Sequence, residues 1–417
     1  MKFKAAVLDR HGVERPYNQT KPLVIREVEL REPKADEVLV KLAASGLCHS
    51  DLSVINGDRS RQIPMVLGHE AAGVVEKIGE GVTDLVPGDH VVCVFVPNCG
   101  HCQPCAEGRP ALCEPGAAAN GKGEMLSGGL RLFCDDGDVY HHCGVSAYAE
   151  YAVMSRYSII RIEKDIPLHI AALMGCAVLT GTGSIFNTGL VKPGSRVAIA
   201  GLGGVGLAAV MGAVAAGATE IIALDMFDDK LALAEQLGAT KTFNVQSEGV
   251  VEAVKEYTKG GVDAAFEYAG SGAALAMCYA LTKRGGEVVT AGLPNPKNML
   301  SIPAVSLVAE EKSIRGSYLG SGVPTRDIPL FLDLYRKGKL PVESFSPIVS
   351  SLKKLTRVLS ALLLEKQSGR SLNSIDGWSI IAGFGLRARS GIAQSCLFGQ
   401  LCRFSASFFP YSKCKRS

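Results

Sequence analysis

The stretch SRVAIAGLGGVGLAAVMGAVAAGATEIIALD, residues 195–225, decides the fold of this chain. It begins with a short apolar run, passes through clustered glycines, continues as a small-residue segment at 204–217 and ends in a second apolar run at 220–225. This order predicts a strand, a turn, a helix and a second strand parallel to the first. Similar runs at 263–267 and 286–290 predict further strands of the same sheet.

The glycine turn predicts a dinucleotide site. It matches G-x-G-x-x-G, and its candidate cofactor-binding residues are Gly201, Gly203, Gly204 and Gly206. Glycines let the backbone approach a pyrophosphate, and the N-terminus of the following helix offers unpaired N–H groups to it. Asp225 can accept hydrogen bonds from ribose hydroxyls and would repel a 2′-phosphate, so we predict NAD rather than NADP. Lys230 is a further candidate for the ribose, with a solvated surface lysine as the alternative.

Four clustered cysteines predict a structural metal centre. They have the spacing C-x2-C-x2-C-x7-C and are Cys99, Cys102, Cys105 and Cys113. Four thiolates so close together can close a tetrahedron around one zinc ion and leave no position for a substrate. The alternatives are chance clustering or disulfide pairing, and the spacing disfavours both.

A second, scattered set predicts a catalytic metal centre. Cys48, His69 and Cys176 supply two sulfurs and one imidazole, which leaves a fourth position of a zinc ion open. Each residue taken singly is more often part of a core than a ligand. Their combination with the dinucleotide turn favours the ligand interpretation, and the chain is thus expected to hold two zinc ions.

Composition sets the class of protein. A chain of 417 residues, 47% hydrophobic and 20% charged, is typical of a globular protein with two domains. The formal charge of +3 conceals an uneven distribution, because residues 353–417 hold 11 Lys and Arg against 2 Asp and Glu. The preceding residues are mildly acidic, which gives no reason to expect a nucleic acid or a membrane as partner. Without a signal-peptide pattern, and with cysteines in metal-type clusters, we expect a cytoplasmic location.

Together these motifs resemble the zinc-dependent medium-chain alcohol dehydrogenases over roughly residues 1–350. The stretch GHEAAG at 68–73 is similar to the zinc signature of that family. The resemblance implies an α/β protein with a GroES-like, β-rich catalytic domain and a doubly wound Rossmann domain built on a parallel sheet. The implied segments are a catalytic domain at 1–177 with its zinc lobe at about 97–115, an NAD domain at 178–319, and a return to the catalytic domain at 320–352.

The resemblance also implies an activity and further site residues. Members oxidise alcohols to aldehydes or ketones with NAD, and a homodimer or homotetramer is expected. Ser50 stands where the family has a hydroxyl that passes the substrate proton on, and His49 matches a basic position near the pyrophosphate. Asp51 matches a carboxylate that orients His69, and Glu70 matches the acid beneath the metal. Phe95 and Ile63 are candidate pocket walls, with core packing as the alternative for Ile63.

Two departures leave other functions open. Ser53 replaces a histidine that relays the proton in liver-type enzymes, and Ala117 replaces an arginine of the glutathione-dependent formaldehyde dehydrogenases. The second departure disfavours S-(hydroxymethyl)glutathione as substrate. A zinc-free quinone reductase is disfavoured because all three catalytic ligands are present. The remaining alternative is a non-catalytic protein that binds zinc and NAD and is inactivated by its altered C-terminus.

The tail at 353–417 departs from the family. Lys353–Ser360 can be back-translated so that the frame one base earlier reads EEINEGFE, and 365–370 similarly gives GKAIRS, both of which resemble the family's ending. We therefore hypothesise a frameshift near Leu352, with a genuine divergent extension as the alternative. A frameshifted tail would lack the family's last strand and pyrophosphate arginine, and we expect it to be disordered.

Overall fold

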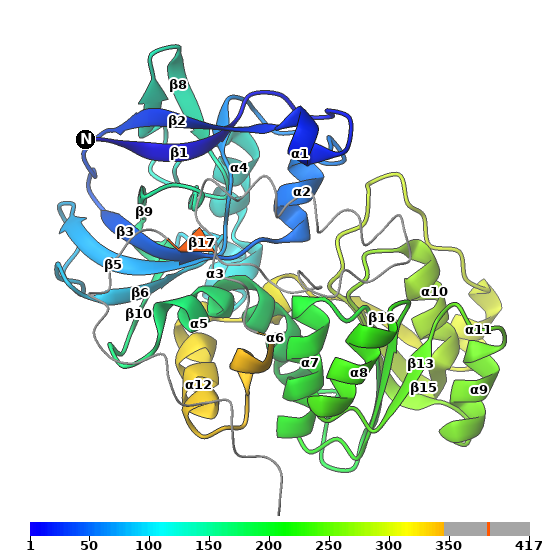
Figure 1. Ribbon diagram of the computed structural model, residues 1–417. Coiled ribbons are helices and arrows are strands. Elements are labelled where there is room, and N and C mark those ends of the chain that lie inside the picture. Colours follow the sequence, from blue (N-terminus) through cyan, green and yellow to red (C-terminus); the bar gives the residue numbers. More distant parts are fainter. Residues whose placement is uncertain (346–381, 384–417) are drawn as a thin grey trace, which may run out of the picture. The chain divides into compact units, whose positions relative to one another are not determined.

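The computed structural model describes residues 1–345 and 382–383 of the chain (Figure 1). These residues belong to one compact unit, Met1–Gly385. Most of the segment 320–352 is described, whereas the tail 353–417 lies outside the described residues except for a two-residue strand. The expected disorder and the frameshift hypothesis therefore stay predictions, which the nucleotide sequence around the codon for Leu352 would test.

The first part of the chain forms two β-layers, in agreement with the β-rich domain that the resemblance implies. One is a closed barrel with the order β1 (Lys2–Leu8), β2 (Leu23–Leu30), β7 (Leu132–Cys134), β8 (Gly137–His141) and β4 (Met65–Val66). The other is a sheet with the order β10 (Ile159–Ile162), β6 (His90–Cys93), β5 (Ala71–Ile78), β3 (Glu37–Ser45) and β17 (Ala382–Gly383), and β9 (Tyr151–Ser155) also pairs with β3. In β3, Val38, Val40 and Leu42 are buried at alternate positions, which is the period of a strand with one face on the core.

The second part forms a parallel sheet. Its order is β13 (Lys241–Asn244), β12 (Glu220–Asp225), β11 (Arg196–Ala200), β14 (Val262–Glu267), β15 (Thr282–Thr290) and β16 (Ser313–Gly316). Counted from β11 this is 3-2-1-4-5-6, the order of a doubly wound dinucleotide-binding fold. The covering helices are α7 (Gly204–Ala215), α8 (Asp228–Gln236), α9 (Val250–Tyr257), α10 (Gly272–Leu281) and α11 (Ala304–Ala309). The predicted fold class is therefore confirmed.

The remaining α-helices accompany the β-layers or connect the two parts. They are α1 (Tyr17–Thr20), α2 (His49–Ile55), α3 (Gln103–Ala106), α4 (Glu114–Lys122), α5 (Leu168–Leu173), α6 (Leu179–Asn187) and α12 (Pro324–Arg336). Met174–Val178 is a π-helical turn that joins α5 to α6 into one continuous run. Such π turns occur often at functional sites because they insert one residue into a helix and re-aim its neighbours.

This run, Leu168–Asn187, lies in the core. It is the one helical run among the described residues that is long and apolar enough to cross a membrane, with a mean hydropathy of 1.5, but 89% of its window is buried inside the protein. Leu173 and Leu179 from the run belong to the same buried cluster as Met211 of α7 and Phe331 of α12. Its apolar character is thus explained by packing.

Candidate active site and metal centres

The four clustered cysteines converge on one point. The sulfur atoms of Cys99, Cys102, Cys105 and Cys113 all lie within 4.8 Å of one another, and none of them forms a disulfide. The Cys113 sulfur accepts backbone N–H groups of Cys99 at 3.2 Å and of Gly116 at 3.4 Å. These N–H donors favour the thiolate that binds zinc, whereas burial outweighs them in the metal-free protein and raises the pKa of Cys113. This geometry suits a closed metal centre.

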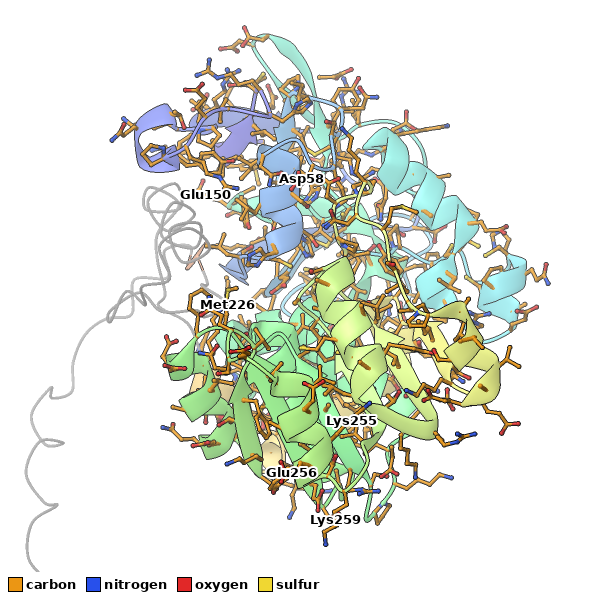
Figure 2. The ribbon with its side chains drawn as sticks, turned by 90° about the vertical axis from the view of Figure 1, so that its right-hand side faces the viewer. Asp58, Glu150, Met226, Lys255, Glu256 and Lys259 are labelled. Carbon is orange, nitrogen blue, oxygen red and sulfur yellow. The ribbon has the colours of Figure 1, made fainter. Side chains whose placement is uncertain are left out.

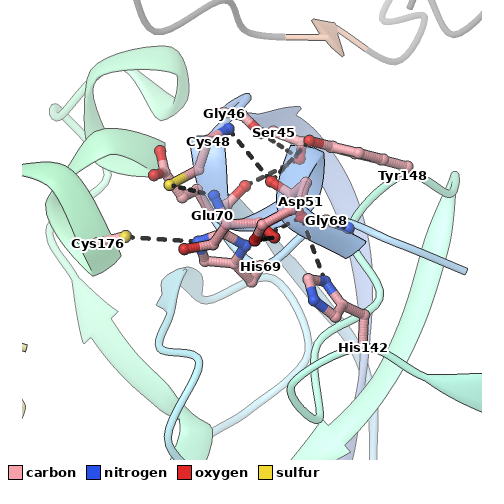
Figure 3. Close-up of polar contacts among 12 residues, drawn as sticks. Ser45, Gly46, Cys48, Asp51, Gly68, His69, Glu70, His142, Tyr148 and Cys176 are labelled. Carbon is pink, nitrogen blue, oxygen red and sulfur yellow. Dashed lines mark hydrogen bonds and ion pairs between the residues drawn. The ribbon is translucent and has the colours of Figure 1, made fainter. Parts of the chain in front are cut away.

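The scattered set of Cys48, His69 and Cys176 also converges, and Glu70 lies beside it. Donor atoms of Cys48, His69, Glu70 and Cys176 lie within 4.8 Å of one another. The sulfur of Cys176 lies 3.5 Å from Nε2 of His69 (Figure 3). Three separate segments deliver these side chains, because Cys48 directly precedes α2, His69 follows β4 and Cys176 lies in the π turn.

Close backbone packing holds the π turn in place. A Cβ atom on Gly175 would lie 2.0 Å from the carbonyl oxygen of Cys93, so only glycine allows this approach. Likewise, a Cβ atom on Gly46 would lie 2.2 Å from Oε2 of Glu70. Glycines beside Cys48 and Cys176 therefore bring the two sulfurs toward His69.

Asp51 orients the imidazole of His69. Its Oδ1 lies 3.0 Å from Nδ1 of His69 and accepts the N–H of Gly68 at 3.1 Å, while Oδ2 accepts the N–H of Cys48 at 3.2 Å. The side chain is fully buried, yet the neighbouring His69 and His142 outweigh the cost of burial and hold the pKa of Asp51 well below its usual range. Against the effect of burial, the ionised Asp51 and the neighbouring Cys48 raise the pKa of His69. The contact at Nδ1 directs Nε2 toward Cys176, where a metal would replace the proton on Nε2.

The acidic groups around the scattered set disfavour one another's ionised forms. A hydrogen bond from Cys176, together with the charge of His69, lowers the pKa of Cys48 well below its ordinary value. Burial, followed by the charge of Cys48, raises the pKa of Glu70 to about 8. Oε2 of Glu70 is buried and has no hydrogen-bond partner among the described residues. Two thiols, an imidazole and an unpartnered carboxylate oxygen fit a zinc ion.

The other residues expected from the resemblance lie around this centre. Ser50 is half-buried in the first turn of α2, and His49 beside it is exposed. Phe95 packs edge-on against His69, with ring centroids 5.2 Å apart. Ile63 instead packs against the cluster of the barrel and α2, which favours the core alternative for it.

The dinucleotide turn has the expected strand–turn–helix geometry. Gly201 follows β11 with φ +89°, and Gly203 precedes α7 without a side-chain cap. Apart from its chain neighbours, no described residue has an atom within 4 Å of where a Cβ atom on Gly203 would lie, so this position beside the helix N-terminus leaves room for a ligand. Open space and uncapped N–H groups fit a pyrophosphate.

Asp225 supports this turn from the end of β12. Its Oδ2 accepts the N–H of Leu202 at 2.7 Å, and its Oδ1 accepts the N–H groups of Met226 and Phe227 at 2.8 and 3.1 Å. Figure 2 shows Met226, the residue after Asp225, at the end of the parallel sheet opposite to Lys259. Lys230 lies over the Phe227 ring, with its Nζ 4.8 Å from the ring centroid. The sequence did not reveal that Asp225 also fixes the glycine turn.

Three residues near the scattered set are not predicted by any sequence motif. Tyr148 and His142 contact Asp51, and Tyr318 stacks edge-on against Phe95 with centroids 5.9 Å apart. None of them lies in a motif, and only the folding of distant segments brings them to the site. No local signal in the sequence could have identified them.

Comparisons with known proteins agree with this geometry. Residues 34–164 match the family model described as alcohol dehydrogenase GroES-like domain, and residues 204–337 match the one described as zinc-binding dehydrogenase. The chain is 39% identical to an NDMA-dependent alcohol dehydrogenase of Amycolatopsis methanolica, over 82% of this chain and 91% of the relative.

The chain is also similar in fold and sequence to solved structures of dehydrogenases. The benzyl alcohol dehydrogenase of Acinetobacter calcoaceticus is 32% identical with a TM-score of 0.83, over 92% of this chain and 100% of the other. A zinc-binding dehydrogenase of Sinorhizobium meliloti bound to NADP is 27% identical with a TM-score of 0.72, over 92% of this chain and 99% of the other.

Proposed function

Because this chain belongs to the zinc-dependent medium-chain alcohol dehydrogenase family, we propose that it oxidises alcohols reversibly to aldehydes or ketones, with zinc at Cys48, His69 and Cys176 and hydride transfer to NAD. The observation that carries this proposal is the convergence of these three side chains and Glu70 within 4.8 Å. The convergence occurs in the same chain as an open glycine turn at the start of α7. A second zinc ion at the four clustered cysteines would be structural.

Each group of the site has a role in this reaction. A zinc ion held by the scattered set would supply Lewis acidity, which lowers the pKa of a substrate hydroxyl. The Ser50 hydroxyl would accept the proton of that hydroxyl, since it lies two residues from Cys48 at the start of α2. Phe95 and Tyr318 would form an aromatic wall that orients the substrate carbon and excludes water.

The onward path of the proton differs from that of liver-type members. Oγ of Ser53 donates to the carbonyl oxygen of Ser50 at 2.8 Å and accepts from Nε of Arg59 at 3.0 Å. Because both bonds occupy this hydroxyl, we propose that the proton leaves Ser50 through water rather than through Ser53.

The choice of NAD rests on Asp225. Its carboxylate lies at the end of β12, where it would meet the ribose of a dinucleotide bound at the glycine turn. The S. meliloti relative binds NADP and the A. methanolica relative is NDMA-dependent, so the acceptor needs a direct test. Aldehyde formed from benzyl alcohol would be measured by chromatography with NAD, NADP or NDMA supplied in turn. We expect product with NAD, and product with NDMA alone would overturn NAD as a free co-substrate.

We also propose that the chain self-associates. Among the described residues, β16 is the last strand on its side of the parallel sheet, and α11 just before it exposes Val305 by 74% and Val308 by 82%. An unpaired strand edge beside exposed apolar side chains can pair and pack with the same surface of a second copy of the chain. Light scattering after gel filtration should show at least a dimer for the native chain and a lower mass for Val308→Asp. A monomeric native chain would contradict the proposal.

A further inference from the structure

Asp51 has more partners than the orientation of one imidazole requires. Both of its oxygens are engaged by neighbours that lie at 2.9 to 3.2 Å (Figure 3), and these are Cys48, Gly68, His69, His142 and Tyr148. Three of them belong to the two segments that carry Cys48 and His69. The other two, His142 and Tyr148, come from the stretch between β8 and β9 and are not members of the scattered set.

Tyr148 reaches Asp51 from a fully buried position. Its hydroxyl donates to Oδ2 of Asp51 at 2.9 Å, and the side chain is 0% exposed. The ring packs against Gly68, where a Cβ atom would lie 2.6 Å from its Cδ1. The backbone N–H of Tyr148 donates to the carbonyl oxygen of Leu67 at 2.8 Å. A backbone hydrogen bond and a ring contact therefore hold the segment that carries His69 against Tyr148.

His142 approaches Asp51 from another direction. Its Nδ1 lies 3.2 Å from Oδ1 of Asp51, an ion-pair distance without the alignment of a hydrogen bond. Its ring stands edge-on to that of His69, with centroids 5.6 Å apart. The N–H of His142 donates to Oγ of Ser146 at 3.0 Å, which fixes the backbone at this position.

These contacts matter because the carboxylate of Asp51 divides its hydrogen bonds and its charge among all the groups that contact it. With Tyr148 and His142 in place, Asp51 cannot turn away from His69, and its charge is shared instead of resting on one imidazole. We propose that Tyr148 and His142 are positioning residues, which act through Asp51 to set the orientation of His69 and thereby the retention and ligand field of the metal. This inference rests on the metal centre of the proposed function.

The experiment compares four variants of the full chain loaded with zinc. Tyr148→Phe removes only the hydroxyl, and His142→Leu removes the ring nitrogens. His142→Asn places an amide nitrogen near the position of Nδ1 and should restore the contact. Tyr17→Phe is the matched control, because Tyr17 is also buried but its hydroxyl has no partner among the described residues.

Zinc release to the chelator 4-(2-pyridylazo)resorcinol is followed by absorbance. The rate of release from the four-cysteine centre of the same protein serves as the internal reference. We expect release from the other centre to be about tenfold faster in Tyr148→Phe and His142→Leu. Release from His142→Asn and Tyr17→Phe should stay close to that of the native chain. Replacement of the released zinc by Co²⁺ should give visible absorption bands that are shifted in Tyr148→Phe but not in Tyr17→Phe.

Two results would overturn the inference. One is a native release rate together with an unshifted cobalt spectrum in both Tyr148→Phe and His142→Leu. The other is faster release from both centres at once, which would indicate general loosening of the fold. A native chain that binds only one zinc ion would instead refute the proposed metal centre itself, so the two failures are distinguishable without any measurement of turnover.

Discussion

The Cβ atom that Gly206 lacks would lie 1.9 Å from the carbonyl oxygen of Gly201. A Cβ atom on Gly203, three residues earlier, would meet no atom of the described residues within 4 Å apart from its chain neighbours. The two glycines thus serve different purposes, since one allows helix α7 to pack against the turn and the other leaves room for a ligand.

A pair of alanine substitutions separates these purposes. Gly203→Ala should leave the melting temperature unchanged and weaken NADH binding by about tenfold or more, because its methyl group occupies ligand space. Gly206→Ala should destabilise the protein by roughly 1–3 kcal/mol through overpacking. Calorimetric unfolding and NADH fluorescence titration measure both effects. Equal loss of stability in the two variants would contradict this division of roles.

If the two metal centres are independent, a substitution in one centre should remove its zinc ion and leave the other ion bound. His69→Ala should reduce zinc from two ions to one per chain and abolish turnover. Cys102→Ser should also remove one ion and lower the unfolding temperature, because a closed zinc centre contributes directly to folding. Elemental analysis and thermal unfolding of both variants test this. Loss of both ions from either variant would show that the centres are not independent.

A buried ion pair predicts acid sensitivity. Glu37 in β3 accepts two hydrogen bonds from Arg131, at 2.6 and 2.8 Å, and both residues are buried. Burial alone would raise the pKa of Glu37, but the hydrogen bonds from Arg131 and Ser127 outweigh it and lower that pKa below its ordinary value of 4.5. The ionised form therefore stabilises the fold above about pH 4.5, and this contribution is lost as the pH falls through the lowered pKa.

The variant Arg131→Met tests this pair. It leaves Glu37 buried without its cation, so we expect a loss of about 3–5 kcal/mol at pH 7. The loss should shrink as the pH approaches 4, because Glu37 is then protonated in the variant. Urea unfolding at pH 7 and pH 4 measures it, with surface Arg31→Met as the control. A loss that is the same at both pH values would argue against the ionised pair.

Asp225 predicts cofactor preference. In Asp225→Asn the amide oxygen can still accept the N–H groups of Met226 and Phe227, but the negative charge and the acceptor for the N–H of Leu202 are gone. The two cofactors are therefore compared as a ratio, because a disturbed glycine turn would weaken both. Removal of one charge near a 2′-phosphate should raise the ratio of kcat/KM for NADP to that for NAD by about tenfold. Initial rates at constant alcohol concentration measure the ratio, and an unchanged ratio would contradict the role of Asp225.

Much of the fold was predictable because its signals are local. The turn at 201–206 lies between two apolar runs, and helix α7 begins at Gly204 as that pattern predicts. The cysteine spacing at 99–113 likewise needs no distant segment to form a cluster. Strand β15 shows the limit, since it extends back to Thr282 through polar residues that no apolar run marks.

The scattered site was harder to predict from residue patterns alone. The local sequence of Cys176 taken alone does not predict a ligand, so its selection over the buried Cys278 relied on its combination with Cys48, His69 and the dinucleotide turn. The π turn that presents Cys176 has no sequence signature. Tyr148 and His142 depend on the packing of the stretch after β8 against Gly68, a tertiary contact without a periodic pattern.

The central claim is most directly tested by NADH formation at 340 nm from zinc-loaded protein supplied with NAD and benzyl alcohol. We predict turnover by the native chain, no turnover by Cys176→Ala, and native turnover by Cys278→Ala, which removes a buried thiol remote from the scattered set. Absence of turnover from native protein that holds two zinc ions, or undiminished turnover in Cys176→Ala, would contradict the account.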